Sequence, residues 1–197
     1  MKIGVLALQG AVSEHIDMLK KAGADSAVPV RKEEEIASVD GLVIPGGEST
    51  TMGRLIKAFN LEDVIRRRVS EGMPVYGTCA GMILLASRIE GYDQFKFGFI
   101  DLTIVRNAFG RQVDSKEIDL NVKGFDTPFH AIFIRAPVGK EPGENVEVLS
   151  EVPEGIVFAR QENVLVSAFH PELGQDLRVH KYFLDMVRKF LKNREVL

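Results

Sequence analysis

Short runs of apolar residues alternate with segments of helical periodicity along the first half of this chain. The apolar runs suit buried strands, which we expect at residues 3–8, 27–30, 41–44 and 73–76. Between them, apolar side chains recur at helical spacing and predict helices near residues 12–22, 50–59 and 61–71. Strands that alternate with helices in this way are typical of a parallel sheet covered by helices on both faces.

The pattern changes after residue 90, where apolar runs follow one another with few helical segments between them. These runs predict strands at residues 102–106, 118–122, 131–134, 146–149, 156–159 and 165–169. The chain then ends in a helix with an apolar stripe formed by Leu177, Phe183, Leu184, Val187, Phe190 and Leu191. We therefore expect an α/β fold in a single domain, residues 1–197. It would be a three-layer, mostly parallel sheet with helices on both faces and an antiparallel extension in the second half.

Composition limits the classes of function. The 197 residues, 45% of them hydrophobic, suffice for a substantial core. A net charge of −3 provides no basic surface, so no nucleic-acid partner is expected. The single cysteine excludes an internal disulfide, and the apolar N-terminal run is too short for a membrane span or a signal peptide. These features predict a soluble, cytoplasmic protein without a membrane partner.

The cysteine, Cys79, lies where an apolar run turns into an apolar helical segment beginning near Met82. Gly77 and Gly81 allow a tight turn and leave space around the sulfur. The arrangement is the thiol counterpart of the nucleophile elbow, a sharp strand-to-helix turn that exposes a reactive side chain. A helix N-terminus behind the sulfur favours the thiolate, so we expect a nucleophile here. A buried, unreactive cysteine is the alternative.

An activated cysteine needs a base, and the base needs an orienting partner. His170 follows the last predicted strand at its carboxyl end, where open α/β sheets build their sites. Glu172 comes two residues later, and Pro171 disfavours helix at position 170, so the two side chains can point the same way. We expect Glu172 to orient the imidazole of His170.

The other three histidines lack this context. His15 lies beside the apolar stripe of the first helix, where a packed or surface side chain is expected. His130 follows a turn without an obvious partner, and His180 is expected to face solvent from the last helix.

A glycine-rich loop at residues 45–51 directly follows the strand predicted at 41–44. Gly46 and Gly47 allow backbone N–H groups to converge on an oxyanion, although a simple capped turn would have the same composition. Ser49 or Thr50 is expected to cap the helix that follows. The sequence contains neither a phosphate-binding glycine motif nor spaced metal ligands, so no metal is expected.

Together these segments resemble the class I (triad) glutamine amidotransferases, and within them most closely the glutaminase subunits of pyridoxal 5′-phosphate synthase. The resemblance extends in order over nearly the whole chain, through residues 8–10, 45–51, 77–81, 106–112, 133–137 and 169–173. The elbow and the His-Pro-Glu sequence mark the superfamily, whereas residues 106–112 and 133–137 indicate the subfamily. Lys116 and Gly174 replace a common phenylalanine and threonine, outside the proposed chemistry.

The resemblance implies a catalytic triad of Cys79, His170 and Glu172 that hydrolyses L-glutamine to glutamate and ammonia through a thioester. Backbone N–H groups of Gly47 and Ala80 would hold the oxyanion. The implied glutamine contacts are Gly47, Glu48, Ser49, Arg106, Ile134 and Arg135. The two arginines suit the α-carboxylate of the substrate, since a guanidinium can bind a carboxylate through paired hydrogen bonds; a surface ion pair is the alternative.

The resemblance further implies a partner, a (β/α)₈-barrel synthase subunit in a hetero-oligomer that uses the ammonia to build pyridoxal 5′-phosphate. That compound would be the product of the partner, so this chain is expected to need no cofactor. We place the docking face around Gln9, His15 and the loop at 46–51.

Three alternatives stay open. The chain could be the glutaminase subunit of a different synthase, such as imidazole glycerol phosphate synthase, although residues 106–112 argue against it. A stand-alone cysteine hydrolase usually has a histidine directly after its cysteine, where this chain has Ala80. A catalytically silent regulatory subunit would have no need of an intact triad.

Overall fold

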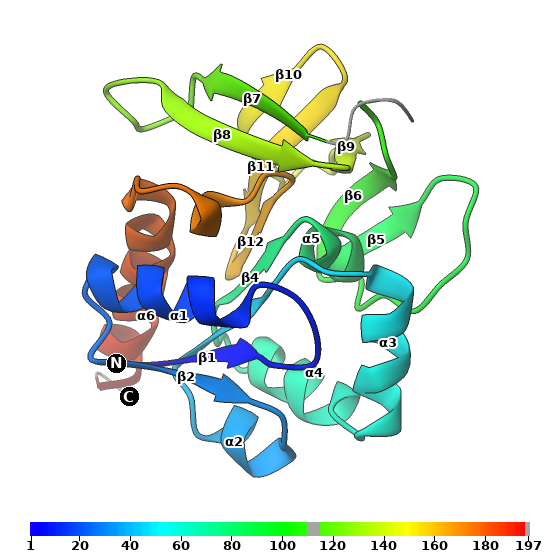
Figure 1. Cartoon of the computed structure of the whole chain (residues 1–197). Helices are drawn as coiled ribbons and strands as arrows, with labels where there is room; N and C mark the ends of the chain where they lie inside the picture. Colours follow the sequence, from blue (N-terminus) through cyan, green and yellow to red (C-terminus); the bar gives the residue numbers. More distant parts are fainter. Residues whose placement is uncertain (110–114, 196–197) are drawn as a thin grey trace.

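The computed structural model describes residues 1–109 and 115–195 and shows an α/β fold built on one large sheet (Figure 1). Five parallel strands form its centre in the order β2-β1-β3-β4-β12. They are β1 (Lys2–Leu6), β2 (Ser26–Val30), β3 (Gly41–Ile44), β4 (Val75–Thr78) and β12 (Val164–Ser167). The predicted parallel sheet is therefore confirmed, with strand bounds shifted by one or two residues at most positions.

Helices cover both sides of these strands. Helices α1 (Val12–Ala22) and α6 (Arg178–Glu195) pack together on one side, and α3 (Ser49–Ala58) and α5 (Ala80–Leu85) on the other (Figure 1). Two further helices are α2 (Glu33–Ala37) and α4 (Glu62–Ser70). Helix α1 ends at Gly23, whose φ of 105° places it in the left-handed region that favours glycine.

The antiparallel extension follows β12. Strand β11 (Gly155–Gln161) runs antiparallel to β12, to β10 (Glu147–Val152) and to β9 (Val138–Lys140). Strand β6 (Ile100–Val105) pairs with β9 and, in parallel, with β5 (Ala86–Ile89). Strands β7 (Ser115–Leu120) and β8 (Phe129–Ile134) form a separate antiparallel ribbon. The predicted extension in the second half is confirmed.

Strands β5 and β9 were absent from the sequence prediction. Residues 82–86 are apolar and suggest a longer helix, but α5 ends at Leu85 and the chain continues as β5. Strand β9 is only three residues long, too short for a periodic pattern.

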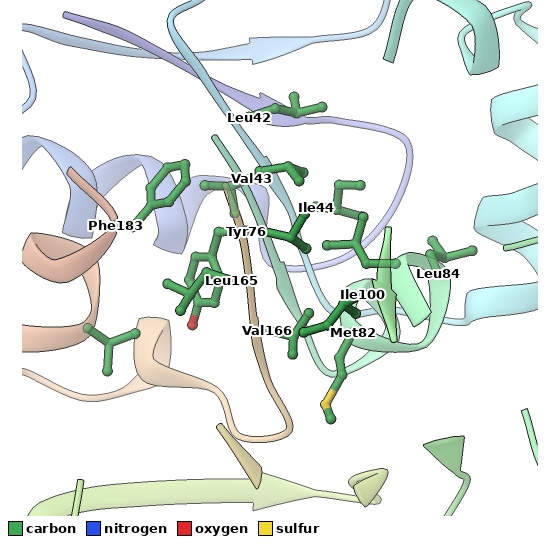
Figure 2. Close-up of a cluster of buried hydrophobic side chains, with 14 of the residues drawn as sticks. Leu42, Val43, Ile44, Tyr76, Met82, Leu84, Ile100, Leu165, Val166 and Phe183 are labelled. Atoms are coloured by element: carbon green, nitrogen blue, oxygen red, sulfur yellow. The ribbon is translucent and has the colours of Figure 1, made fainter. Parts of the chain in front are cut away.

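The core lies around the central strands. Figure 2 shows Leu42, Val43 and Ile44 of β3 and Tyr76 of β4 between Phe183 on one side and Leu84 on the other. All six side chains are fully buried, and full burial of an apolar side chain of this size is worth roughly 1.5–3 kcal/mol. The hydroxyl of Tyr76 meets that of Ser167 at 2.8 Å, which satisfies both buried groups. This packing and pairing anchor β4 and β12, whose carboxyl ends lead into Cys79 and His170.

In the part of the chain that the structure describes, no helix combines the length and apolar character needed to cross a membrane.

Candidate active site

Cys79 occupies the predicted elbow between β4 and α5. Its backbone φ is 50° and its ψ is −103°, a region that non-glycine residues seldom occupy. The backbone N–H of Cys79 donates to the carbonyl of Ser167 at 2.8 Å, which fixes the turn to β12. Gly81 approaches the carbonyl oxygen of Ile44 so closely that a Cβ atom would collide with it. The elbow is therefore a strained turn that packs closely against β3.

His170 follows β12 and is held from two directions. Its Nδ1 lies 2.6 Å from Oε1 of Glu172, and its backbone N–H donates to the carbonyl of Ile132 at 2.8 Å. Glu172 belongs to a 3₁₀ turn, η1 (Pro171–Leu173), and its side chain has no exposed surface. The imidazole is therefore oriented as the sequence predicts, with its other nitrogen left for Cys79.

The protonation states of His170 and Glu172 depend on each other and on their neighbours. Burial opposes protonation of His170, but hydrogen bonds to Cys79 and Glu172 and the charges of both raise its pKa to about 10. Burial would likewise raise the pKa of Glu172, yet the neighbouring His15 and His170 lower it overall. The arrangement favours an imidazolium paired with a carboxylate at neutral pH.

The glycine-rich loop lies directly over the imidazole. A Cβ atom on Gly46 would approach Cε1 of His170 to 2.6 Å, so only glycine allows this proximity. The next residue, Gly47, has a φ of 156°, and the N–H of Glu48 donates to Oε1 of Gln9 at 2.8 Å. Ala80 is the first residue of α5, where backbone N–H groups have no partner within the helix. The loop and the elbow thus bring both predicted oxyanion donors to one place.

Glu48 caps helix α3, in place of the predicted Ser49 or Thr50. Its carboxylate accepts hydrogen bonds from the backbone N–H groups of Thr50 at 3.1 Å and Thr51 at 2.7 Å. Although partial burial acts in the opposite direction, these bonds lower the pKa of Glu48 to about 2. A carboxylate can serve as a cap through the same N–H groups that serine usually engages.

A cavity of about 730 Å³ opens at the elbow. All residues predicted to be catalytic, to hold the oxyanion or to bind glutamine line this cavity, and so does Gln9. They are Gln9, Gly47, Glu48, Ser49, Cys79, Ala80, Arg106, Ile134, Arg135, His170 and Glu172. Cys79 is 9% exposed and lines this cavity.

The guanidinium of Arg106 is supported by residues that sequence analysis did not identify. It donates to Oε1 of Gln94 at 3.3 Å and stacks on the ring of Tyr92 with 4.6 Å to the centroid. Gln94 also accepts from the hydroxyl of Ser49 at 3.2 Å. Neither Gln94 nor Tyr92 belongs to a recognisable motif, and no sequence signal places them beside Arg106.

Backbone strain marks the cavity as well. Asn107 and Arg135, both lining it, have positive φ values of 52° and 42°. Residues 110–112, the second part of the segment that indicated the subfamily, lie outside the described residues.

The prediction for His180 is wrong, and of the two readings for His15 the packed one is observed. His180, expected to face solvent, is fully buried, and His15, placed in the docking face, also has no exposed surface. A buried side chain cannot contact a partner, so the prediction for His15 as an interface residue is wrong for its side chain. The exposed His130, for which no partner was evident, lies 2.8 Å from Asp119 and 3.0 Å from Glu117.

A family model described as the SNO glutamine amidotransferase family matches residues 5–189. This chain belongs to that family. Among its relatives, the pyridoxal 5′-phosphate synthase subunit PdxT of Thermosipho africanus is 56% identical over 189 residues, covering 96% of this chain and 100% of the relative. The protein of the same name from Carboxydothermus hydrogenoformans is 52% identical, covering 97% and 100%.

Solved structures agree with the assignment to the SNO glutamine amidotransferase family. One described as a glutamine amidotransferase is 49% identical, with a TM-score of 0.88 over 94% of this chain and 98% of the other. The structure of PurLQS from Thermotoga maritima is only 15% identical, with a TM-score of 0.63 over 96% and 98%, and shares the fold alone. The predictions of a class I glutamine amidotransferase, and of an enzyme with glutaminase activity, are confirmed.

Within residues 1–109 and 115–195, no group of three or more His, Cys, Asp or Glu side chains is arranged to hold a metal ion.

Proposed function

We propose that this chain hydrolyses L-glutamine through a thioester on Cys79 and supplies the ammonia to the synthase subunit of pyridoxal 5′-phosphate synthase. The observation that carries the chemistry is the 2.6 Å contact between Nδ1 of His170 and Glu172, at the base of the cavity that contains Cys79. The family match and the names of the relatives support the synthase as the destination of the ammonia.

Acylation begins with the thiolate of Cys79. The sulfur bonds to the side-chain amide carbon of glutamine, and the carbonyl oxygen becomes an oxyanion held by the N–H groups of Gly47 and Ala80. Each such donor typically lowers the barrier by about 3 kcal/mol. The imidazolium of His170 then gives its proton to the amide nitrogen, the C–N bond breaks and ammonia leaves. A γ-glutamyl thioester remains.

Deacylation requires His170 to act in the opposite direction. Its pKa is raised partly by the charge of Cys79 and by the hydrogen bond to it. Formation of the thioester removes both effects, so the pKa of His170 falls and the neutral imidazole can accept a proton from water. Hydroxide adds to the thioester carbon, the C–S bond breaks, and glutamate leaves as the thiolate and imidazolium are restored.

The cavity also provides for recognition of the substrate. The guanidinium groups of Arg106 and Arg135 suit the α-carboxylate, and the carboxylate of Glu48 suits the α-ammonium group. Arg106 and Glu48 approach within 3.7 Å of each other, so they can bind the two charged groups of one amino acid side by side. Ser49 and Ile134 complete this part of the wall.

The partner we propose is a (β/α)₈-barrel synthase subunit in a hetero-oligomer. Gln9 is exposed at the rim of the cavity and bonded to the glycine-rich loop through Glu48, so a protein docking there would contact the loop that holds the oxyanion. This contact gives docking a physical route to activation of the enzyme. Pyridoxal 5′-phosphate would form on the synthase and would not be a cofactor of this chain.

The test measures glutamate release from glutamine by the chain alone and mixed with a purified pyridoxal phosphate synthase subunit. We expect a slow basal rate that rises on mixing. Cys79→Ala and His170→Asn should each reduce the rate at least about a thousandfold while partner binding persists. The matched control is His130→Asn, which replaces an exposed histidine outside the cavity and should leave the rate unchanged.

Other outcomes would favour the alternatives. Basal activity that does not respond to the synthase subunit would indicate a different synthase. If the folded wild-type chain releases no glutamate, either alone or with the synthase subunit, a regulatory subunit would be indicated. Turnover by folded Cys79→Ala would contradict the mechanism.

A further inference from the structure

A pair of buried histidines lies behind the triad, on the side of helices α1 and α6. Nδ1 of His15 is 3.1 Å from Nε2 of His180, although 165 residues separate them. The other nitrogen of His15, Nε2, is 3.1 Å from the hydroxyl oxygen of Thr78 and 3.4 Å from Oε2 of Glu172. Thr78 directly precedes Cys79, so His15 contacts both the strand that carries the nucleophile and the carboxylate that orients the base.

Burial disfavours the charged form of both histidines. Burial lowers the pKa of His15, and burial together with the neighbouring His15 lowers that of His180 to about 3. The titratable groups that act on His15 are Glu172, His170 and Glu14, besides His180 itself. A neutral imidazole has one N–H, which donates a hydrogen bond, and one bare nitrogen, which accepts one. The position of the proton therefore determines which neighbour each nitrogen can bind.

The carboxylate of Glu172 determines which nitrogen of His15 carries the proton. Its oxygen Oε2 is buried and has no hydrogen-bond donor among the described residues, whereas Oε1 pairs with His170. If Nε2 of His15 were bare, its lone pair would face this charged oxygen at 3.4 Å, and the two would repel each other in a buried site. Nε2 of His15 therefore carries the proton, which donates to Thr78 and lies beside Oε2.

His180 completes the arrangement. With Nε2 of His15 protonated, Nδ1 of His15 is bare and accepts the N–H of His180 Nε2 at 3.1 Å. The remaining nitrogen, Nδ1 of His180, then has a lone pair, and it is the buried atom for which the described residues provide no partner. An unpaired neutral nitrogen costs less than an unpaired carboxylate oxygen, so this assignment is the favoured one.

We propose that His15, oriented by His180, is a positioning residue for the triad, whose N–H beside Oε2 holds the Glu172 carboxylate with Oε1 on His170. This proposal rests on the proposed function in one respect: it takes Cys79, His170 and Glu172 to be the catalytic triad. Without the N–H of His15, Oε2 would be a buried charged oxygen that has lost the N–H beside it, and the carboxylate would rotate or take up a proton. Either change weakens the bond from Oε1 to His170.

Two isosteric replacements of His15 separate positioning from packing. In His15→Gln the side-chain amide nitrogen falls near the position of Nε2, beside Glu172. In His15→Asn it falls near the position of Nδ1, beside His180, and Glu172 loses its neighbour. Both variants are neutral amides of similar polarity, so a general effect of substitution would affect them alike. Leu19→Ala, one helical turn further along α1 in the same buried face, controls for loss of stability.

The readouts are the pH profile of kcat/KM for glutamine and the rate of alkylation of Cys79 by iodoacetamide between pH 5 and 9. Cys79 is the only cysteine of the chain, so alkylation reports on the thiolate–imidazolium pair without turnover or partner. For His15→Asn we expect about a tenfold loss of kcat/KM, an alkaline limb shifted to lower pH and slower alkylation at neutral pH. His15→Gln should stay close to wild type, and Leu19→Ala should keep both profiles.

The proposal is overturned if folded His15→Asn keeps the wild-type alkylation profile, or if His15→Gln and His15→Asn lose activity equally with unshifted profiles. Should neither variant fold, His180→Gln replaces them, with the same profile shift expected and an unchanged profile counting against the proposal. Hydrolysis by Cys79→Ala would contradict the proposed function instead, and would leave the alkylation result interpretable on its own.

Discussion

At the scale of single residues, the site depends on where a few protons lie. Glu172 presents one oxygen to His170 at 2.6 Å and the other to His15 at 3.4 Å, so its two oxygens serve different neighbours. A carboxylate with one oxygen bonded to His170 and the other beside His15 is restrained against rotation, and the imidazole bonded to it keeps one tautomer. The reactivity of Cys79 is thereby linked to a residue on helix α1, on the far side of Glu172 from the cavity.

This arrangement predicts a spectroscopic result. At pH 7, His15 and His180 should both be neutral with the proton on Nε2, as read from ring ¹⁵N shifts in a long-range NMR correlation. His130 is the internal reference, because hydrogen bonds to Asp119 and Glu117 raise its pKa and make it more cationic. A proton on Nδ1 of either buried ring would contradict the assignment.

The sequence predicts the triad but not the residues behind it. Cys79, His170 and Glu172 lie in local patterns whose chemistry is evident over a few positions. His15 and His180 lie on helices whose apolar stripes are formed by other residues, and nothing in a single sequence indicates a contact across 165 positions. Gln94 likewise supports Arg106 through tertiary folding alone.

At the scale of secondary-structure elements, the elbow depends on a close approach between α5 and β3. Gly81 touches the carbonyl of Ile44, so the helix that follows Cys79 is pressed onto the strand before the glycine-rich loop. This contact links the two elements that carry the proposed oxyanion donors, Ala80 and Gly47.

Gly81→Ala should therefore lower the free energy of unfolding by about 1–3 kcal/mol. The added Cβ would meet the backbone carbonyl of Ile44, which cannot rotate away as a side chain could. Urea unfolding followed by circular dichroism measures the change. Gly174→Ala is the matched control: its φ is −93° and the nearest atom to an added Cβ is 3.8 Å away, so a change within about 0.5 kcal/mol is expected. Equal stability of the two variants would contradict the packing argument.

Elements whose pattern is strong were predicted well, and those decided by tertiary contacts were not. The apolar run of β3 is short and is followed at once by Pro45, Gly46 and Gly47, which favours a buried strand, and its predicted bounds are those observed. Strand β5 begins inside an apolar run, where a helix and a strand have the same appearance. The capping of α3 by Glu48 was missed because serine and threonine, the usual caps, follow it directly.

At the scale of the whole molecule, buried histidines make stability depend on pH. The folded pKa of His180 is about 3 against an ordinary value of 6.5, so below pH 6.5 the unfolded chain binds a proton that the folded chain does not. Stability is therefore lost as the pH falls from 6.5 toward 3, and His15 acts in the same direction. His170 acts in the opposite way: its contribution is complete below pH 6.5 and is lost as the pH rises to about 10.

We expect the free energy of unfolding to fall between pH 6.5 and about 5, before most carboxylates titrate, by up to about 1.4 kcal/mol per pH unit for each buried histidine. In His180→Phe this slope should be smaller, whereas Leu19→Ala should lower stability equally at every pH. Denaturant unfolding across this range makes the comparison. Parallel curves for wild type and His180→Phe would show that His180 is not buried in its neutral form.

The position of Cys79 has a consequence for oxidation. It is the only thiol in the chain, 9% exposed at the base of a cavity open to small solutes, and it is paired with an imidazolium. A peroxide that reaches the cavity would convert it to a sulfenic acid, and no second cysteine is present to condense with that group as an internal disulfide. Recovery of the enzyme therefore depends on a reducing thiol from outside, small enough to enter by the path that glutamine takes.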